Sequence, residues 1–352
     1  MDRDCRFGTA RGYTAGSGAT SSAAICLSGT PGPANYRIAE EFTTAPITAA
    51  VLTEGSVFLS GGTTLKGFGK AAGIPAATWS SGGDMNTARR AMGGAGADNT
   101  AALGFGGLEP SASGKTEKYN GTSWTESGDI PSARWNVGGC GTQTAGASIG
   151  GETPSPAYDD STFHFNGSSW TASADLNTGR REISAAGTTT SLIAFGGNEP
   201  PDSAKAESFD GTSFTEVGDM NTARRNMGEA GSSNTSAFGF GGESPTKANA
   251  ETWNGSSWTE VGDLNTARYY AGSAGVVSSA LIYGGLSPNK ANTEAWNGSS
   301  WSEVNDLSTA RYGGSDKGSA VSAILGGGYT TTNVASTEEF TADNALATVT
   351  VS

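Results

Sequence analysis

The chain has 352 residues, of which 54 are glycine, and its formal net charge is −13. A chain this acidic is a poor binder of nucleic-acid phosphates, which require a basic surface. Three cysteines, Cys5, Cys26 and Cys140, are too few for a disulfide framework. The sequence contains neither a run of about 20 apolar residues nor the apolar core of a signal peptide, so we expect no membrane insertion and no classical secretory route.

Residues 1–8 match no repeat, and we expect them to form a tail or an added edge strand. From residue 9 onward the chain repeats itself, and the segment 9–29 aligns with 266–285. This first unit is shortened, because only four residues separate Phe42 from Pro46, whereas later units have fifteen between the corresponding aromatic residue and an arginine. About one strand and its turn are therefore missing from the first unit.

A complete unit is clearest between Arg268 and Arg311. It begins with small residues suited to a crowded inner strand and continues with an apolar strand closed by Gly284-Gly285. After a loop that contains proline, two further strands flank Asn297-Gly298. An Asn-Gly pair between such strands is typical of a type I′ turn, in which both central residues take positive φ. The unit therefore predicts four antiparallel strands.

The spacing of the units indicates a β-propeller. The second aromatic residue of the unit recurs every 43–46 residues, at Trp79, Trp124, Trp170, Phe214, Trp258 and Trp301. A period of about 40–50 residues with four strands per unit is the pattern of propeller blades. Counted by glycine pairs, eight units begin near residues 11, 46, 89, 134, 180, 224, 268 and 311.

We therefore predict an all-β fold with a single propeller over residues 9–352. It would have about eight four-stranded blades, or seven if one irregular unit spans the closure. A terminal strand would close the ring, supplied either by residues 1–8 or by the alternating C-terminal run ALATVTVS.

Several anchors of the repeat resemble the kelch repeat of β-propellers, here Gly284-Gly285, Trp296, Trp301 and Arg311. The resemblance extends over nearly the whole chain from residue 9, although Asp-Leu-Asn-Thr-Ala replaces the family's Pro-rich segment before the arginine. The recurring sequence Asn-Gly-Ser-Ser-Trp also resembles that of the kelch-like structural proteins of bacteriophages, marine ones in particular. This second resemblance implies a virion component, made in the host cytoplasm, that contacts other virion proteins or a host surface glycan or receptor.

The residue that follows the repeat arginine varies from unit to unit. Arginine and large aromatic residues are enriched at binding hot spots, and both types also suit sugar recognition. Because these positions follow the loop into the inner strand, we predict that they ring one mouth of the propeller as a contact face, unless they pack between blades. They are Arg90, Trp135, Arg181, Arg225, Tyr269 and Tyr312. The loops after the glycine pairs also vary in length, which makes them a second candidate for recognition.

An Asp and an Arg five residues apart recur six times, and we interpret them as structural, with a ring of cation sites or a charged channel mouth as the alternative. They are Asp84 and Arg89, Asp129 and Arg134, Asp175 and Arg180, Asp219 and Arg224, Asp263 and Arg268, and Asp306 and Arg311. Four Asn-x-Ser/Thr sites coincide with the hairpin turns, which explain them: Asn120, Asn166, Asn254 and Asn297.

We predict no catalytic residues, no cofactor and no metal site. His164 is the single histidine and is interpreted as a structural strand residue, so the chain lacks the two histidines of kelch-containing copper oxidases. The turn around Asn254 resembles a sialidase Asp-box but carries Asn and the wrong spacing to Trp258. The sequence therefore favours a non-enzymatic binding or structural module, with a carbohydrate-active enzyme and a bacterial surface adhesin or filament subunit as alternatives.

Overall fold

The structure is a computed structural model that describes residues 77–342 except 156–157 and 244, and outside this range it describes only six short strands. The chain divides into two compact units, Met1–Phe58 and Leu59–Ser352. In the first unit β1 (Ala15–Thr20), β2 (Ala23–Leu27) and β3 (Glu40–Thr43) form an antiparallel sheet in that order. A second small sheet has the order β32 (Leu346–Thr348), β5 (Thr64–Phe68) and β4 (Val57–Ser60).

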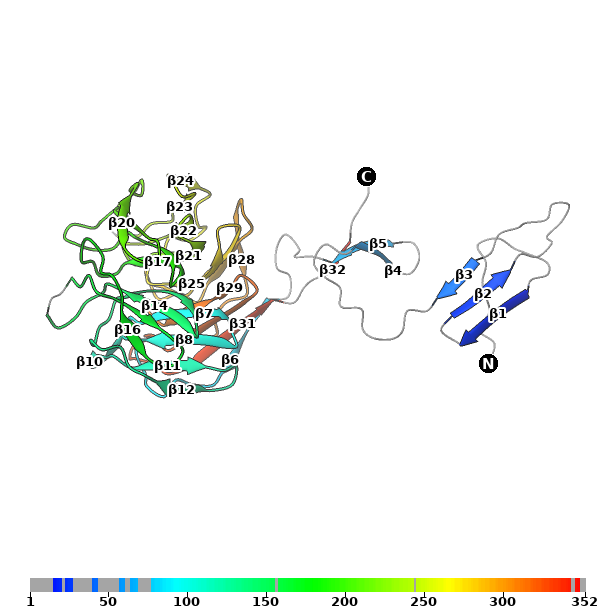
Figure 1. Cartoon of the computed structure of the whole chain (residues 1–352), viewed down its shortest axis with the longest axis horizontal. Helices are drawn as coiled ribbons and strands as arrows, with labels where there is room; N and C mark the ends of the chain where they lie inside the picture. Colours follow the sequence, from blue (N-terminus) through cyan, green and yellow to red (C-terminus); the bar gives the residue numbers. More distant parts are fainter. Residues whose placement is uncertain are drawn as a thin grey trace. The chain divides into compact units, whose positions relative to one another are not determined.

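The residues from 77 to 342 form six four-stranded antiparallel sheets, the blades of a β-propeller (Figure 1). From the inner strand outward, blade 1 contains β7 (Gly93–Asp98), β8 (Ala101–Phe105), β11 (Thr116–Tyr119) and β12 (Trp124–Ser127). Blade 2 contains β13 (Gly138–Thr142), β14 (Ala145–Ile149), β15 (Thr162–Phe165) and β16 (Trp170–Ala172). Blade 3 contains β17 (Ser184–Thr188), β18 (Ser191–Phe195), β19 (Ala206–Phe209) and β20 (Phe214–Val217).

The remaining three blades repeat this order. Blade 4 contains β21 (Gly228–Ser233), β22 (Ser236–Phe240), β23 (Ala250–Trp253) and β24 (Trp258–Val261). Blade 5 contains β25 (Gly272–Val276), β26 (Ser279–Tyr283), β27 (Thr293–Trp296) and β28 (Trp301–Val304). Blade 6 contains β29 (Ser315–Ser319), β30 (Ser322–Gly326), β31 (Thr337–Ala342) and β6 (Ala77–Gly82), and a two-stranded ribbon of β9 (Leu108–Glu109) and β10 (Ser111–Ala112) extends from blade 1.

The inner strands crowd around the axis of the ring. Each inner strand contacts that of the next blade, and β29 of blade 6 contacts β7 of blade 1. A Cβ atom added to Gly94 would lie 2.1 Å from the carbonyl oxygen of Asp316 in the neighbouring blade. Small residues are therefore required where two inner strands approach, as the sequence predicted.

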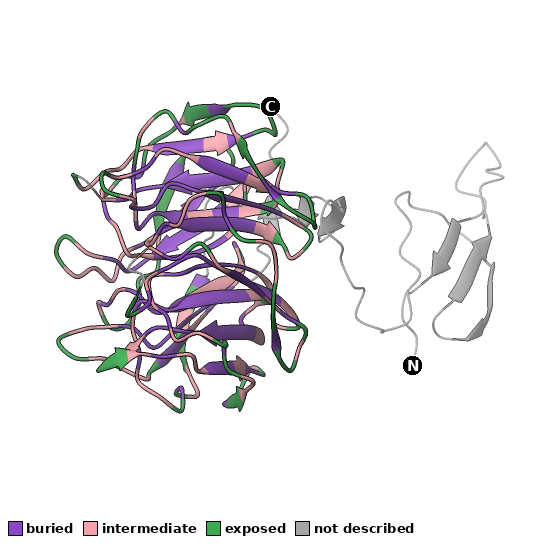
Figure 2. Ribbon diagram, turned by 60° about the vertical axis from the view of Figure 1, so that its left-hand side comes forward, coloured by how far each residue is buried: buried purple, intermediate pink, exposed green. Residues whose placement is uncertain are grey.

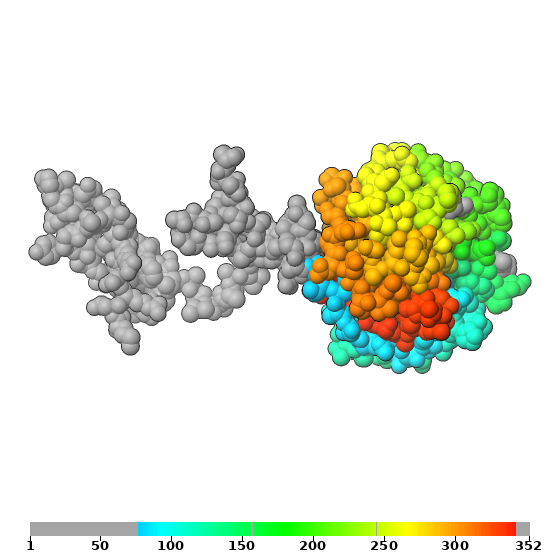
Figure 3. Space-filling view, turned by 180° about the vertical axis from the view of Figure 1, so that it is seen from behind, coloured from blue at the N-terminus to red at the C-terminus, as the bar shows by residue number. Residues whose placement is uncertain are grey.

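The ring is closed by β6, whose residues precede the first complete blade in the sequence. This strand pairs with β31, with Trp79 opposite Phe340, so the outermost strand of blade 6 comes from the beginning of the propeller. Figure 3 shows the two ends of the propeller side by side, with the residues near 340 in red beside those near 80 and 90 in cyan. Of the two terminal segments predicted to close the ring, residues 1–8 lie outside the described residues, and within the C-terminal run β32 pairs with β5.

The prediction of eight blades, or seven, is wrong, because the propeller has six. The glycine-pair count included the units near residues 11 and 46, whose strands form the two small sheets, apart from β6, which completes blade 6. A blade requires both an arginine before its inner strand and an aromatic outer strand. The unit near residue 11 has Arg11 but no second aromatic residue, and the unit near residue 46 has Trp79 but Pro46 in place of the arginine, so neither contains both anchors. The all-β propeller with four-stranded blades is confirmed, and it is compatible with a kelch-type propeller.

The predicted type I′ turn is also wrong in detail. In blade 4, Trp253 lies opposite Trp258, the backbone N–H of Asn254 donates to the carbonyl of Ser257, and only Gly255 has positive φ, at 94°. The glycine is thus the first central residue, as in a type II′ turn. The Asn254 side chain caps this turn, because its Oδ1 accepts the backbone N–H groups of Ser256 and Ser257.

The core consists of aromatic residues that pack both within a blade and between neighbours. Figure 2 shows buried residues (purple) along the strands and exposed residues (green) mostly in the loops and outer strands. Between blades 4 and 5, Phe240 lies 5.0 Å from Trp301 and Phe238 lies 5.4 Å from Trp296, measured between ring centroids. These contacts lock adjacent blades together and keep the faces of the ring rigid.

Candidate binding face at the mouth of the ring

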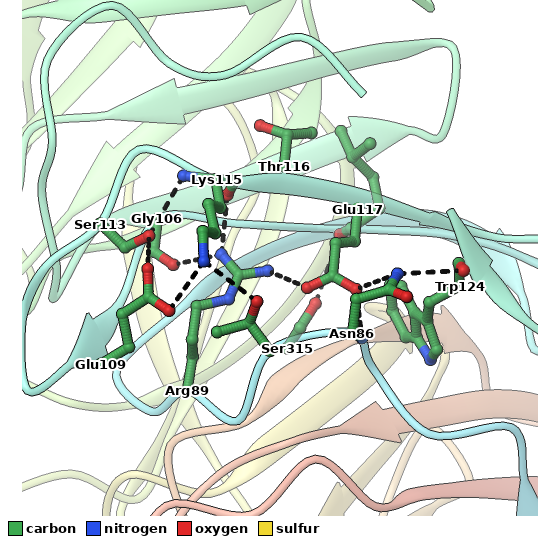
Figure 4. A network of polar contacts seen from close by, with 12 residues as sticks. Asn86, Arg89, Gly106, Glu109, Ser113, Lys115, Thr116, Glu117, Trp124 and Ser315 are labelled. Atoms are coloured by element: carbon green, nitrogen blue, oxygen red, sulfur yellow. Dashed lines mark hydrogen bonds and ion pairs between the residues drawn. The ribbon is translucent and has the colours of Figure 1, made fainter. Parts of the chain in front are cut away.

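A buried arginine fixes the loop that enters each blade. Figure 4 shows Arg89, whose Nη1 donates to the carbonyl oxygens of Gly106 and Lys115, both at 2.7 Å, and whose Nη2 donates to Glu117 at 2.7 Å. The second carboxylate oxygen of Glu117 accepts the backbone N–H of Asn86 at 2.7 Å and its side-chain amide at 2.9 Å. One side-chain cluster therefore holds the loop from blade 6 against the third strand of blade 1.

The same ion pair occurs in every blade, and we call its cationic members the clamp arginines. All six are at most 1% exposed, and five pair with a glutamate on the third strand of their blade. The pairs are Arg89–Glu117, Arg134–Asp159, Arg180–Glu207, Arg224–Glu251, Arg268–Glu294 and Arg311–Glu338. Because the backbone carbonyl of Arg134 also accepts the N–H of Gly107 in blade 1, the clamp connects neighbouring blades as well.

The structural interpretation of the repeated Asp and Arg agrees with this geometry. Asp175 and Asp306 accept backbone N–H groups from Thr162 and Thr293, the first residues of third strands. The partner of the arginine is the glutamate, however, and the sequence analysis missed it. A Glu two residues before the first aromatic residue, as in Glu251 before Trp253, was the signal that could have revealed it.

The six predicted contact residues lie together around one mouth of the ring, and we call them the mouth residues. Each forms a β-bridge with the residue that follows the glycine pair of its own blade, for example Arg90 with Leu108 and Tyr312 with Tyr329. The variable loops therefore surround the same mouth. All six side chains, those of Arg90, Trp135, Arg181, Arg225, Tyr269 and Tyr312, are half-buried. Partial exposure is what a contact face requires, and their role in binding stays a prediction.

The next residue of each blade forms a backbone ring around the axis. Positive φ values of 52–63° occur at Ala91, Asn136, Glu182, Asn226, Tyr270 and Gly313. The N–H of Asn136 donates to the carbonyl of Ala91, and the same bond links each later pair as far as Gly313 and Tyr270, at 2.8–3.1 Å. A non-glycine residue with positive φ is uncommon and strained. Five such residues at one repeat position hold the mouth residues in a fixed geometry.

One side of the mouth is aromatic. Ring centroids are 6.4 Å apart for Tyr269 and Tyr270, 5.8 Å for Tyr270 and Tyr312, and 5.4 Å for Tyr312 and Tyr329. The guanidinium of Arg90 lies 4.6 Å from the centroid of Tyr329. We call the four tyrosines the tyrosine arc, and they come from blades 5 and 6.

The other side of the mouth is ionic and comes from blades 2 to 4. Arg181 pairs with Glu152 at 2.9 Å. Arg225 pairs with Glu182 at 3.3 Å, with Asp202 at 3.3 Å and with Glu243 at 3.2 Å. We call these six residues the ionic arc. Burial raises the pKa of Glu182, while the charges of Arg225 and Arg181 act against this shift.

Two small cavities lie on the axis, below the mouth. The upper cavity, of about 70 Å³, is lined in part by Tyr270, Glu182, Asn226 and Glu229, and the lower one, of about 60 Å³, by Glu229 and Lys317 among small residues. The Tyr270 hydroxyl donates to Asn136, three blades away and thus on the opposite side of the ring. The tyrosine therefore spans the axis and lines the upper cavity.

A charged cluster lies between the two cavities. Lys317 pairs with Glu229 at 2.5 Å, and the neighbouring Asp316 accepts the hydroxyl of Ser273 at 3.0 Å. Burial raises the pKa of Glu229 to about 7, against the opposing charge of Lys317. Burial alone lowers the pKa of Lys317, but the charges of Asp316 and Glu229 outweigh it and raise the pKa above its ordinary value.

The other candidates fit structural roles. His164 is half-buried on β15, its ring lies 5.6 Å from that of Phe209, and burial lowers its pKa. Burial raises the pKa of Cys140 to about 12, which suppresses its thiolate form. The four Asn-x-Ser/Thr residues are all exposed at turns. Among the described residues, no group of His, Cys, Asp and Glu side chains is arranged to hold a metal ion.

Sequence reasoning missed the residues inside the mouth, of which Glu182, Tyr270 and Tyr329 are the most prominent. Their signal was the same as that of the mouth residues: they occupy repeat positions at which the residue type changes from blade to blade.

Comparison with known proteins found no family model that matches the chain and no curated protein that matches it. In the described part of the chain, no helix is long and apolar enough to span a membrane.

Proposed function

We propose that this chain is a non-enzymatic binding and structural module whose mouth face contacts its partner. The propeller fold is consistent with such a module. One observation carries the proposal: within a strongly repeated scaffold, the six mouth residues vary in type, remain half-buried and gather on one face. Arginine, tryptophan and tyrosine, the three types found there, are those enriched at binding hot spots.

We further propose that the module belongs to a bacteriophage virion, as a tail, fibre or other surface-exposed component, made in the host cytoplasm. The resemblance of the repeated Asn-Gly-Ser-Ser-Trp turns to phage structural proteins supports this setting. Its partners would be neighbouring virion proteins or the host surface, within a larger assembly, and the acidic charge of −13 disfavours nucleic acid as a partner. Portal, tail or capsid genes beside its own gene would support the proposal, and their absence would contradict it.

The contact face is tested by changing Trp135 and Tyr269 together to Ala and measuring binding to the proteins encoded by neighbouring structural genes. Loss of two aromatic anchors should weaken binding about 30-fold or more, while the melting temperature changes little. Val276→Ala is the matched control, because Val276 is 40% exposed at the far end of β25 from Tyr269. A double variant that melts early, with its folded fraction binding normally, would contradict the contact face. Turnover of a sialoside or of galactose, abolished by one point change, would contradict the non-enzymatic proposal.

A further inference from the structure

We propose that the mouth binds a neutral saccharide, with a sugar ring stacked on the tyrosine arc and its hydroxyl groups bonded to the ionic arc. This inference rests on the proposed function of the mouth as a contact face and specifies the class of ligand. Three independent features of the mouth support it: the aromatic surface of the tyrosine arc, buried polar atoms that no hydrogen bond satisfies, and the side-chain contacts that already occupy each arginine on this face.

The tyrosine arc offers a surface for stacking. Its consecutive rings are inclined by 48–59° to one another, with centroids 5.4–6.4 Å apart, so the arc curves around the mouth. Tyr269, Tyr312 and Tyr329 are half-buried, and each keeps part of its side chain accessible. The C–H groups on one face of a pyranose ring carry a slight positive charge, which the negative face of an aromatic ring attracts. A curved arc of phenol rings therefore suits one or more consecutive sugar rings.

The ionic arc contains buried polar atoms that no hydrogen bond satisfies. Oδ2 of Asp202 accepts no hydrogen bond, and Nε of Arg181 donates none. Oε2 of Glu182 also accepts no hydrogen bond and has only the ion pair with Nε of Arg225 at 3.3 Å. A buried polar atom without a partner costs about 1–3 kcal/mol, so a ligand that supplies a partner gains affinity there. A sugar hydroxyl both donates and accepts, and one ligand class can therefore satisfy carboxylate and guanidinium atoms together.

The two arcs meet at one cavity. Glu182 of the ionic arc and Tyr270 of the tyrosine arc both line the cavity of about 70 Å³, together with the amide side chains of Asn136 and Asn226. That volume exceeds the space for a single water molecule several times. It is large enough for a substituent of a sugar ring that stacks on the arc above it.

The charges on this face favour a neutral ligand over an acidic one. Arg181 and Arg225 already form ion pairs, and Arg90 donates to Asn333 at 3.1 Å while lying over Tyr329. An acidic sugar would have to displace a carboxylate to reach Arg181 or Arg225, and the side-chain amide of Asn333 to reach Arg90. The net charge of −13 would also repel an anionic glycan.

The test is calorimetric titration of the full chain with neutral hexasaccharides of glucose, N-acetylglucosamine, galactose and mannose, and with hexagalacturonic acid as the acidic counterpart. We expect at least one neutral hexasaccharide to bind and the acid to bind more weakly. Tyr312→Ala should lower the affinity about tenfold, whereas Tyr312→Phe, which keeps the ring, should lower it about twofold or less. Glu182→Gln should also weaken binding, and Val276→Ala should leave it unchanged.

Three outcomes would overturn the proposal. They are no binding of any neutral hexasaccharide up to about 10 mM, equal affinity of Tyr312→Ala and the unchanged chain, and tighter binding of hexagalacturonic acid. If the saccharides fail while the Trp135 and Tyr269 double variant still loses its protein partner, the mouth is a protein contact face and only the saccharide inference falls. If both fail, the proposed function falls with it.

Discussion

Arg89 and Arg90 are neighbours in the sequence, yet their side chains lie in opposite environments. The side chain of Arg89 is fully buried and uses its guanidinium on two carbonyl groups and Glu117. The side chain of Arg90 is half-buried at the mouth, where it contacts Asn333 and the ring of Tyr329. The position of Arg89 is arginine in all six blades, whereas that of Arg90 is arginine, tryptophan or tyrosine.

This difference distinguishes repeat positions at which the fold requires a particular side chain from positions at which the side chain can vary. A clamp arginine satisfies the carbonyl of a glycine with positive φ, Gly106 in blade 1, and few other side chains could reach it from the loop. The residue after the clamp arginine, Arg90 in blade 1, forms a β-bridge with the residue after the glycine pair, Leu108. This pairing uses backbone groups alone. The side chain at this position is therefore free to vary, and variation in a repeat indicates a role in recognition.

Blade 2 shows that the ion pair of the clamp is kept even where the residue types around the arginine differ. Phe163 replaces the usual glutamate there, and its ring lies 4.7 Å from the guanidinium of Arg134, which pairs with Asp159 instead. The loop residue that donates to this glutamate elsewhere, such as Asn86, is Pro131 in blade 2. Since proline has no N–H to donate, the acceptor and the donor are lost together.

The largest effect is expected from Arg89→Ala. This change leaves Glu117, which is 0% exposed, as a buried carboxylate without its cation, and it also removes two hydrogen bonds to carbonyl groups. Breaking one partner of a buried ion pair costs about 3–5 kcal/mol. Urea denaturation should show this loss as a lower midpoint. A double variant, Arg89→Met with Glu117→Leu, should recover part of the stability, and a single variant that unfolds at the original midpoint would contradict the clamp.

The next effect concerns Glu229 and Lys317, which form an ion pair like a clamp but are 13% and 12% exposed and occur at one place in the described ring. The pKa of Glu229 is raised to about 7, so the folded chain holds this proton more tightly than the unfolded chain. The contribution is therefore present at acidic pH and is lost as the pH rises from about 4.5 through 7. The free energy of unfolding should therefore fall over this interval, relative to that of Glu229→Gln.

This pH dependence is measured as melting curves of both proteins between pH 5 and 8. Glu229→Gln has no carboxyl group at this position, so its curve should be flatter than that of the unchanged chain. Parallel curves would show that Glu229 titrates normally, and the axial charge cluster would then resemble a clamp pair.

A smaller effect is expected at the hairpin turns, which belong to the scaffold. Gly255 has φ of 94°, and a Cβ atom there would lie 3.1 Å from the Cβ of Thr235. Gly255→Val should therefore cost about 1–3 kcal/mol, seen in the denaturation midpoint. Gly255→Asn is the matched control and should cost less, because asparagine tolerates positive φ better than a β-branched residue. Equal costs for the two variants would point to steric crowding alone.

The four-stranded structure of the complete repeats was predicted correctly from the sequence, whereas the structure of the incomplete first units was not. Glycine pairs, aromatic residues and arginines at a fixed period were enough to predict four-stranded blades, because each of these anchors has a steric or bonding reason. The unit near residue 11 has Arg11 and Ser28-Gly29 at the repeat positions but lacks the second aromatic residue, and the unit near residue 46 has Pro46 in place of the arginine. Neither unit forms a blade by itself. The position of β6 could not be foreseen, since closure joins strands more than 250 residues apart.

The mouth shows the same limit. Repeat position alone gathered the six mouth residues on one face, because the loop before each inner strand ends there. Contacts across the axis could not be predicted from the sequence. The contact from Tyr270 to Asn136, for example, depends on the diameter of the ring and thus on the number of blades. A wrong blade count hides every contact across the axis, although it preserves every contact within a blade.

The smallest effect, and the sharpest test of the comparison, is expected from Arg90→Ala. Arg90 has a hydrogen bond to Asn333 and a cation–π contact with Tyr329, both at a half-buried position. At such a position, contacts of this kind contribute about 1 kcal/mol or less, because water replaces most of what is lost. The denaturation midpoint should therefore shift by a small fraction of the shift for Arg89→Ala. Binding at the mouth should weaken, since Arg90 is one of the six predicted contact residues. If Arg90→Ala costs as much stability as Arg89→Ala, the mouth position is a second clamp, and variation within the repeat does not indicate recognition.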